Sequence, residues 1–366
     1  MTLATLSPSA LLTACGSRAA STVRWASAAN DDAGGTGLVW ADPSSGEAFR
    51  IATEFRGHGL AAHPQRPWEV TLFTRRPGQT CAVLDLREGR VVHAFDATDD
   101  RAFQGHGFYT ADGSRLVTSE AHVETAEGWL GVRETAGYGL IDAMPTSGLG
   151  PHEILPMPDG DTVVVANGGL LTRPETGREV LNLDTMDSSL AYLSLSTGAV
   201  HEAHRVDVPK GSIRHLDVAA SGLVAFGIQV QREPVDYDDV LPLGGWHRPG
   251  ESPRLFDDGL DAVAAMDDYV GSVALDPESS IVGMTSPRGN VALFWNLESG
   301  AYMGLHELVD CSGIAAAGSR FMLSSSVGEV RVLEAADLTE VSGARRRFQD
   351  VHWDNHFAVI DMENAR

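Results

Sequence analysis

Short stretches in which apolar and polar residues alternate recur along most of the chain. After His58, four of them follow one another, at 59–63, 68–74, 80–86 and 90–95, and turn-forming residues separate them. Alternation with a period of two residues is typical of strands that bury one face. We therefore predict a four-stranded antiparallel sheet over this part of the chain.

The same pattern returns along the chain, and a short phrase introduces it each time. Gly150-Pro151-His152-Glu153-Ile154 is the clearest example, with an apolar run and a turn after it. The phrases are centred at positions 58, 106, 152, 215, 272, 313 and 356, so consecutive ones lie 41 to 63 residues apart. A four-stranded repeat of this length is typical of a β-propeller blade.

The two ends of the sequence provide the strands that complete the ring. Three are predicted at 23–28, 37–41 and 48–52, and one at 356–360, which would be the innermost strand of the same blade. Closing the ring in this way removes open sheet edges. The fold class we predict is all-β: a seven-bladed β-propeller, as a single domain over residues 22–366.

Two blades are less well defined by the pattern. The stretch 232–268 contains four Pro residues and does not show where the outer strands of its blade lie. In the blade that begins near residue 313, the outermost strand is predicted at 338–341.

The charge of the chain is strongly acidic. Fifty acidic and 27 basic residues give a formal net charge of −23. This argues against nucleic acid or an anionic membrane surface as a partner, and it favours attraction of cations. Of the three cysteines, Cys81 and Cys311 fall in different repeats, so we expect no disulfide framework.

Residues 1–21 are predicted to be a signal or leader segment outside the propeller. Leu12-Thr13-Ala14-Cys15 resembles a lipoprotein cleavage box, although no Lys or Arg precedes Cys15. We expect export to the periplasm, with a lipid anchor at Cys15 as one route and a plain unstructured tail as the alternative. No other stretch reaches the roughly 18 apolar residues of a membrane span.

Five of the seven phrases contain a histidine. In a propeller the first strand of each blade lines the central channel, so these side chains are expected close together near one mouth. Neutral imidazoles that converge can bind iron, copper, zinc or nickel. A histidine at a repeat position can instead be a structural tie to the neighbouring blade, and both interpretations stay open. The metal-ligand candidates are His58, His106, His152, His215 and His356.

Polar residues are expected around this mouth, beside the histidines or at the ends of the second strands. Glu153 could fix the tautomer of a ligand, and carboxylates such as Glu120 or Asp31 would bias the site towards iron or manganese. The metal we expect is iron, rather than copper or zinc. His352 is close enough in sequence to reach the same mouth, whereas His63, His93, His201, His204 and His306 are expected at the surface. The candidates for this outer set are Glu153, Arg214, Glu120, Asn167, Gln229, Arg288 and Asp31.

Four longer phrases resemble a bacterial family catalogued as domain of unknown function 1513. They are Gly105-His106-Gly107, Gly150–Ile154 with Val165–Gly169, Ser212–Leu216, and Tyr269–Val273 with Thr285–Gly289. The resemblance runs from about Ala26 to Ile360. It implies an exported, usually periplasmic propeller of the quinoprotein-dehydrogenase-like or lactonase-like kind. It also implies gene neighbours that encode imelysin-like iron-regulated proteins and a di-haem thiol oxidoreductase-like protein. The single Arg18 departs from the family's frequent twin-arginine signal.

Three classes of function remain in view. The first is a non-enzymatic metal-binding protein, with iron favoured, that works with periplasmic partners in metal uptake. The second is a quinoprotein-like or lactonase-like enzyme, for which the chain shows no Gly-x-Ser-x-Gly motif and no Trp-docking repeats. The third is a protein-interaction scaffold without metal. We expect the first.

Overall fold

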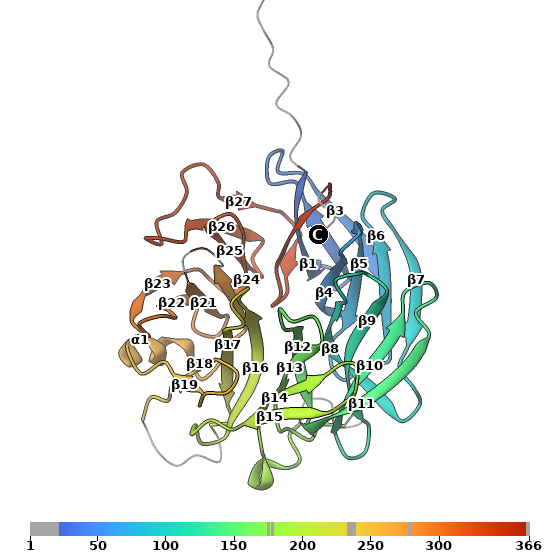
Figure 1. Cartoon of the computed structure of the whole chain (residues 1–366). Helices are drawn as coiled ribbons and strands as arrows, with labels where there is room; N and C mark the ends of the chain where they lie inside the picture. Colours follow the sequence, from blue (N-terminus) through green and yellow to red (C-terminus); the bar gives the residue numbers. More distant parts are fainter. Residues whose placement is uncertain are drawn as a thin grey trace, which may run out of the picture.

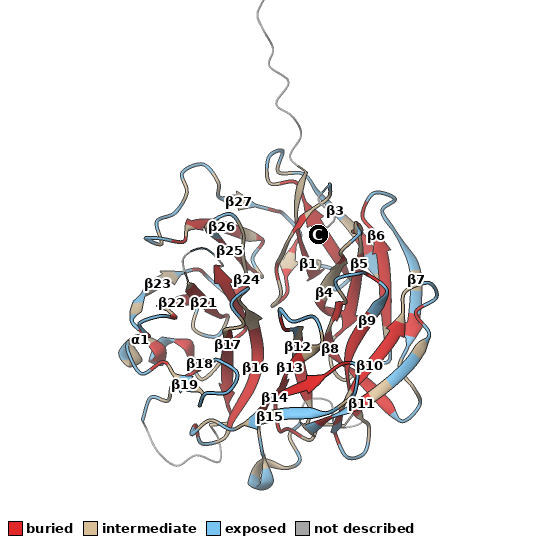
Figure 2. Ribbon diagram, viewed as in Figure 1, coloured by how far each residue is buried: buried red, intermediate tan, exposed pale blue. Residues whose placement is uncertain are grey.

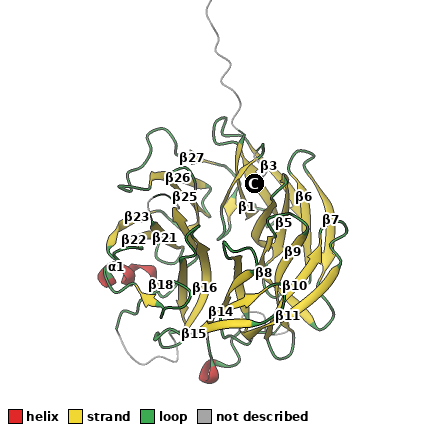
Figure 3. Ribbon diagram, in the orientation of Figure 1, coloured by secondary structure: helices red, strands yellow, loops and turns green. Residues whose placement is uncertain are grey.

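The computed structural model describes residues 22–173, 176, 179–232, 239–276, 278 and 280–363. Seven antiparallel sheets stand around a central axis (Figure 1). Helix in this described part is confined to α1 (Leu260–Val263) and two 3-10 turns, η1 (Leu183–Thr185) and η2 (Ala264–Met266), as Figure 3 shows. The predicted seven-bladed β-propeller is confirmed.

Blades 2 to 7 each contain four strands, and the innermost strands of neighbouring blades contact one another. Blade 2 contains β4 (Gly57–His63), β5 (Arg66–Thr74), β6 (Thr80–Asp85) and β7 (Arg90–Asp96). Blade 3 contains β8 (Arg101–Tyr109), β9 (Arg115–His122), β10 (Glu127–Glu134) and β11 (Leu140–Leu149). Blade 4 contains β12 (Pro151–Pro156), β13 (Thr162–Asn167), β14 (Ser189–Ser194) and β15 (Val200–His204).

The second half of the ring follows the same order. Blade 5 contains β16 (Gly211–Val218), β17 (Val224–Val230), β18 (Gly244–His247) and β19 (Arg254–Leu255). Blade 6 contains β20 (Ser272–Asp276), β21 (Ile281–Ser286), β22 (Val291–Asn296) and β23 (Tyr302–Glu307). Blade 7 contains β24 (Cys311–Ala316), β25 (Arg320–Ser325), β26 (Glu329–Glu334) and β27 (Arg346–Arg347).

Blade 1 joins the two ends of the described chain. It contains β1 (Val23–Asn30), β2 (Thr36–Ala41) and β3 (Ala48–Thr53), and the C-terminal strands β28 (His352–Trp353) and β29 (Ala358–Asp361) both pair antiparallel with β1. The predicted closure by N- and C-terminal strands is therefore confirmed. The single C-terminal strand predicted at 356–360 is instead two short strands, and after the Asp354 N–H has donated to the Ala28 carbonyl, residues 355–357 leave the ladder.

The outer strand of blade 7 lies later in the chain than predicted. Leu338 has a φ of 61°, a left-handed conformation that ends the strand pattern, and only an isolated bridge between Leu333 and Glu340 forms at 338–341. The paired outer strand is β27. In blade 5 the Pro-rich stretch leaves only the short strands β18 and β19, because Pro cannot donate to a sheet ladder.

The core lies between adjacent sheets, where the alternating apolar positions of both sheets meet (Figure 2). The largest cluster joins blades 4, 5 and 6, and within it the rings of Phe256 and Trp295 stack with centroids 4.9 Å apart. Outermost strands such as β23 alternate between half-buried and exposed residues. Cys81 and Cys311 are free thiols buried in two different clusters, in agreement with the expected absence of a disulfide.

A buried ion-pair network stabilises blade 3. The carboxylate of Glu120 on β9 is fully buried and lies 3.0 Å from the guanidinium of Arg133 on β10 and 3.2 Å from that of Arg101 on β8. The Arg133 guanidinium also stacks over the rings of Phe95 and Phe103. Glu120 therefore holds three strands together inside the blade.

Substitution of Glu120 by Gln should strongly destabilise the protein. The change leaves two buried guanidinium groups without their counter-charge, a loss typically of about 3 to 5 kcal/mol. Glu334→Gln is the matched control, because Glu334 pairs with Arg320 at the exposed surface, where such pairs contribute about 0 to 1 kcal/mol. Urea unfolding followed by fluorescence measures both, and equal losses in the two variants would contradict a structural role for the network.

Candidate functional site

The innermost strands depart from regular pairing where the histidines lie. A β-bulge inserts residues that re-aim a side chain out of the strand's alternation. Here the bulges place the imidazoles together at the centre of the ring. The register shifts fall between Gly57 and Leu60, Phe103 and Gly107, Pro151 and Ile154, and Ile213 and His215. His356 lies in the break between β28 and β29. Of the two inner strands that lack a histidine, β20 pairs regularly and β24 has a register shift between Cys311 and Gly313.

All five predicted metal-ligand histidines meet in one cluster. Each imidazole has at least three of the others within 6.0 Å between ring centroids, and the shortest separation is 4.5 Å, between His106 and His356. Four of the side chains are buried and His356 is half-buried. We call this group the five-histidine cluster.

Several ring nitrogens of the cluster are buried without a hydrogen-bond partner among the described residues. A buried polar atom without a partner costs about 1 to 3 kcal/mol, so native structures contain few of them. A neutral imidazole has one lone-pair nitrogen and one N–H, so the six nitrogens on these five rings could offer at most one lone pair per ring. They are His58 Nδ1 and Nε2, His106 Nε2, His152 Nδ1, His215 Nδ1 and His356 Nε2.

The cluster contains two overlapping triads with the spacing of a metal site. One is His58, His106 and His152, and the other is His106, His215 and His356; within each triad the ligand nitrogens lie within 4.8 Å of one another. Metal–nitrogen bonds of about 2.0 to 2.1 Å place two ligands at most about 4.2 Å apart. Small side-chain rotations would therefore close either triad around an ion, and His106 belongs to both.

Burial keeps the imidazoles in the form that binds metal. It lowers the pKa of each of the five rings, and for His106, His152 and His215 the neighbouring rings and the Arg214 guanidinium lower the pKa further. The rings are therefore neutral, with lone pairs available to a cation.

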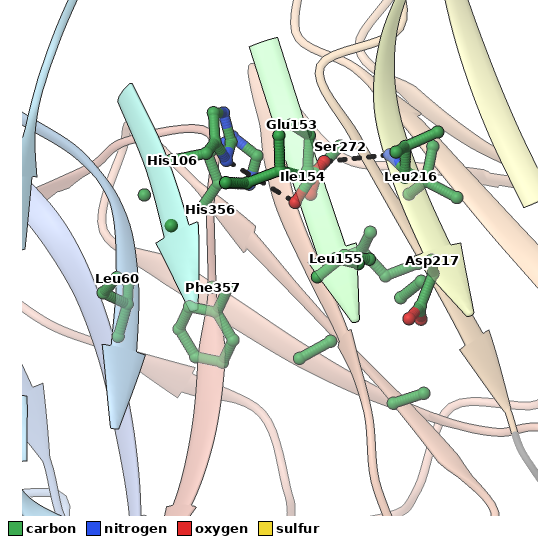
Figure 4. A pocket seen from close by; sticks show the side chains of 17 residues that line it. Leu60, His106, Glu153, Ile154, Leu155, Leu216, Asp217, Ser272, His356 and Phe357 are labelled. Atoms are coloured by element: carbon green, nitrogen blue, oxygen red, sulfur yellow. Dashed lines mark hydrogen bonds and ion pairs between the residues drawn. The ribbon is translucent and has the colours of Figure 1, made fainter. Parts of the chain in front are cut away.

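Glu153 lies against the cluster from the side of the channel (Figure 4). Its carboxylate oxygens are 3.6 Å from His106 Nδ1 and 3.4 Å from His215 Nδ1, and one of them accepts a hydrogen bond from the backbone N–H of Leu216. Burial raises the pKa of Glu153 to about 8, and the Leu216 hydrogen bond only partly offsets this. With Asp217, His106 and His356 it lines a channel cavity of about 240 Å³.

Asp354 supports the cluster from blade 1. Its carboxylate accepts two hydrogen bonds from Arg56, at 3.0 and 2.8 Å, and lies 3.9 Å from His58 Nδ1. Burial alone would raise the pKa of Asp354, but its contacts with His58, Arg56 and Arg75 outweigh burial and hold that pKa below the usual range. Asp354 is therefore a charged carboxylate fixed beside His58.

A second cavity lies on the other side of the cluster, at the mouth that the strand ends form. His58, His152 and His215 form its floor, Arg75, Arg76 and Arg214 contribute guanidinium groups, and Gln229, Tyr269 and Asn355 complete it. We call this space the mouth cavity. The five rings thus stand between the mouth cavity and the channel cavity.

The structure brings only part of the predicted outer set to the cluster. Arg214 and Gln229 line the mouth cavity, and the Arg288 guanidinium lies 4.6 Å from the ring of Tyr269, one of the lining residues. The remaining three candidates contact other parts of the blades. Glu120 is in the blade 3 network, Asn167 ties blades 3 and 4 through Thr146, and Asp31 closes the turn after β1.

Some residues of the site lay outside the predicted set. Arg75 and Arg76 follow the second strand of blade 2, a kind of position at which polar residues were expected around the mouth, but they were not among the named candidates. Asp354, Tyr269 and Asn355 were not expected as site residues. Asp354 and Asn355 directly precede the candidate ligand His356 in the sequence. This position was the signal that could have identified them as site residues. The expectation for His63 was wrong, since it is buried and its Nε2 bonds to the carbonyl of Gly113. His352 bonds to Asp32 and to the Ser326 carbonyl.

A second group of potential ligands contains histidines that act as structural ties between blades. Glu202, His204 and His247 lie close together between blades 4 and 5. His247 uses both ring nitrogens, one with the Tyr192 hydroxyl at 2.6 Å and one with the Glu251 carbonyl at 2.9 Å. This group is satisfied by protein partners, in contrast to the five-histidine cluster.

The family described as Protein of unknown function (DUF1513) matches residues 51–360. The chain belongs to this family. This confirms the resemblance that the four phrases carry. The comparison with curated proteins gave no match.

Among solved structures, Kuenenia stuttgartiensis Hydrazine Synthase is similar, with a TM-score of 0.64 and 13% identity over 82% of this chain and 90% of that chain. A likeness at this identity shows the shared fold alone. Within the described residues of this DUF1513 protein, no helix combines the length and the apolar character needed to cross a membrane.

Substitution of Gly105 by Ala should disturb the five-histidine cluster. Gly105 has a φ of 104°, and a Cβ atom there would lie 2.7 Å from Cδ2 of His58. Gly160→Ala is the control, because Gly160 also has a positive φ, of 78°, but open space around it. The backbone strain costs about 1 to 2 kcal/mol in each variant, so only Gly105→Ala should lose more. Urea midpoints measure this, and equal losses would show that His58 can move aside freely.

Proposed function

We propose that this DUF1513 protein binds a transition metal ion in the five-histidine cluster, with iron favoured over copper and zinc. The observation that carries the proposal is the convergence of six buried ring nitrogens without hydrogen-bond partners. Neutral imidazole is a good ligand for iron, copper, zinc and nickel. The preference for iron is supported by Glu153, whose carboxyl oxygens lie 3.6 Å from His106 Nδ1 and 3.4 Å from His215 Nδ1, because a carboxylate beside imidazoles biases a site towards iron.

The role that follows is metal binding and delivery rather than catalysis. The net charge of −23 attracts cations to the protein. The gene neighbours that the family resemblance implies support iron uptake, with an imelysin-like protein as a periplasmic partner. Export through the leader, with or without lipid attachment at Cys15, belongs to this proposal, and both lie outside the described residues.

Substitution of His106 by Ala should remove most of the bound metal, because His106 belongs to both triads. We expect near-stoichiometric metal in the wild-type protein after anaerobic loading with Fe(II) and dialysis, and less than about a tenth of that content in the variant. His152→Ala and His215→Ala should also lower occupancy. Elemental analysis by mass spectrometry measures the content.

His204→Ala is the matched control, because it removes an imidazole from the group that protein partners satisfy. Metal content should stay at the wild-type value. Loading with Cu(II) or Zn(II) in competition with Fe(II) tests the preference for iron. Unchanged content in the His106, His152 and His215 variants would refute the site. Turnover of a lactone or of an electron acceptor by the loaded protein would favour an enzyme instead.

Metal should also raise the thermal stability of the protein. A ligand at 100 times its Kd stabilises the folded state by about 2.7 kcal/mol, which for a propeller of this size corresponds to a rise in Tm of roughly 4 °C. The Tm of His106→Ala should not rise when metal is added. The metal-free Tm of this variant shows whether its fold is intact. Differential scanning calorimetry with and without metal measures the shift, and equal shifts in both proteins would place the metal elsewhere.

A further inference from the structure

Two spaces meet the five-histidine cluster, and they differ greatly in size. The channel cavity has a volume of about 240 Å³, whereas the mouth cavity has a volume of about 20 Å³. A buried water needs about 10 to 15 Å³, so the mouth cavity has room for about one water and the channel cavity for a group of them. A divalent ion in water carries a shell of several waters. Of the two spaces, only the channel cavity has room for such a hydrated ion.

The channel cavity also leads from the cluster towards solvent. In blades 4, 5 and 7 the inner strand begins with buried residues, at the depth of the cluster, and ends with half-buried or exposed ones. Leu155, Asp217 and Ala316 are half-buried residues at these strand ends, and all three line the cavity. The cavity therefore opens towards the face of the ring opposite the mouth cavity, and the imidazoles lie at its inner end.

The wall of the channel cavity suits a hydrated cation. Glu153 and Asp217 line it, and carboxyl oxygens accept hydrogen bonds from the waters around an ion. No Lys or Arg is among the described residues of this wall. Figure 4 shows Glu153, His106 and His356 at one end of the cavity, with Leu155 and Asp217 further along it. Carboxyl oxygens are therefore available along the cavity as far as the imidazoles, where Glu153 lies 3.6 Å from His106 Nδ1.

We propose that the channel cavity is the route to the five-histidine cluster, and that a hydrated cation enters through it from the face opposite the mouth cavity. The cation part of this proposal rests on the proposed metal binding. On this route the ion exchanges its waters first for His106 and His356, the two cluster imidazoles that line the cavity. His356 is the half-buried member of the cluster, which agrees with its place beside an open space.

The test measures how fast Co(II) binds to the metal-free, full-length protein, by stopped-flow absorption. Ala316, the last residue of β24, is replaced by Lys, Gln and Glu, which are comparable in size and differ in charge. A positive charge on the route repels the cation, so Ala316→Lys should bind Co(II) at least about threefold more slowly than Ala316→Gln, and Ala316→Glu should bind it no more slowly. The metal content at equilibrium should be the same in all three variants.

Ile141→Lys is the control, because it adds the same charge at an exposed position of the outermost strand of blade 3. Its rate should equal that of the wild type. Leu155→Lys and Leu155→Gln, on the wall that blade 4 provides, decide the result if the Ala316 variants do not fold. Equal rates in the Lys and Gln variants would overturn the proposal.

A second measurement does not depend on metal. Diethyl pyrocarbonate labels accessible neutral imidazoles, and mass spectrometry of peptides locates the label. His356 should be labelled in the metal-free wild type, and Ala316→Phe, which narrows the cavity, should lower the labelled fraction of His356 but not that of the exposed His201. If Co(II) does not bind but this labelling falls in the variant, the route stands and the metal function is removed. If His356 is not labelled, or is labelled equally in both proteins, the channel cavity is not the route.

Discussion

The backbone hydrogen bonds between β1 and the two C-terminal strands are the constraint on which the rest of the structure depends. They close the ring, and they also complete the site, because residues 355–357 leave the ladder between β28 and β29. That short break brings His356 to the other four imidazoles and Asp354 to His58 and Arg56. Closure of the fold and assembly of the cluster are therefore linked, and a ring that opens at blade 1 loses the His356 imidazole and the Asp354 carboxylate that lies beside His58.

The bulges explain how a sheet protein can bring so many identical side chains to one point. In a regular strand, neighbouring side chains point to opposite faces of the sheet, towards the two adjacent blades. The extra residues at the register shifts in β4, β8, β12 and β16 break this alternation at the histidines. Gly105 and Gly59 leave the space that the rings need, since a Cβ atom at either would collide with the neighbouring inner strand.

The sequence was sufficient for the fold and for the five histidines, because both follow from a repeat. Every blade repeats the same spacing, and a propeller places equivalent residues of each blade at equivalent depths. Glu120, Asn167 and Asp31 were predicted by the same reasoning from strand ends, and they contact other groups because local pairing decides the direction of a side chain. Glu120 faces Arg101 and Arg133 inside its blade. The sequence does not show which strand end faces the axis. Arg75 and Arg76 lie at the mouth cavity because the geometry of the ring brings the end of their strand there.

The proposed metal site has an energetic argument in its favour. Native proteins are stable by about 5 to 15 kcal/mol in total, and each buried polar atom without a partner costs about 1 to 3 kcal/mol. Unpartnered ring nitrogens in the cluster therefore oppose the stability that the blades provide. The group around His247 shows that this chain can satisfy buried imidazoles with hydroxyl and carbonyl partners. Because the central imidazoles are left without such partners, a ligand that binds their lone pairs stabilises the fold as it binds.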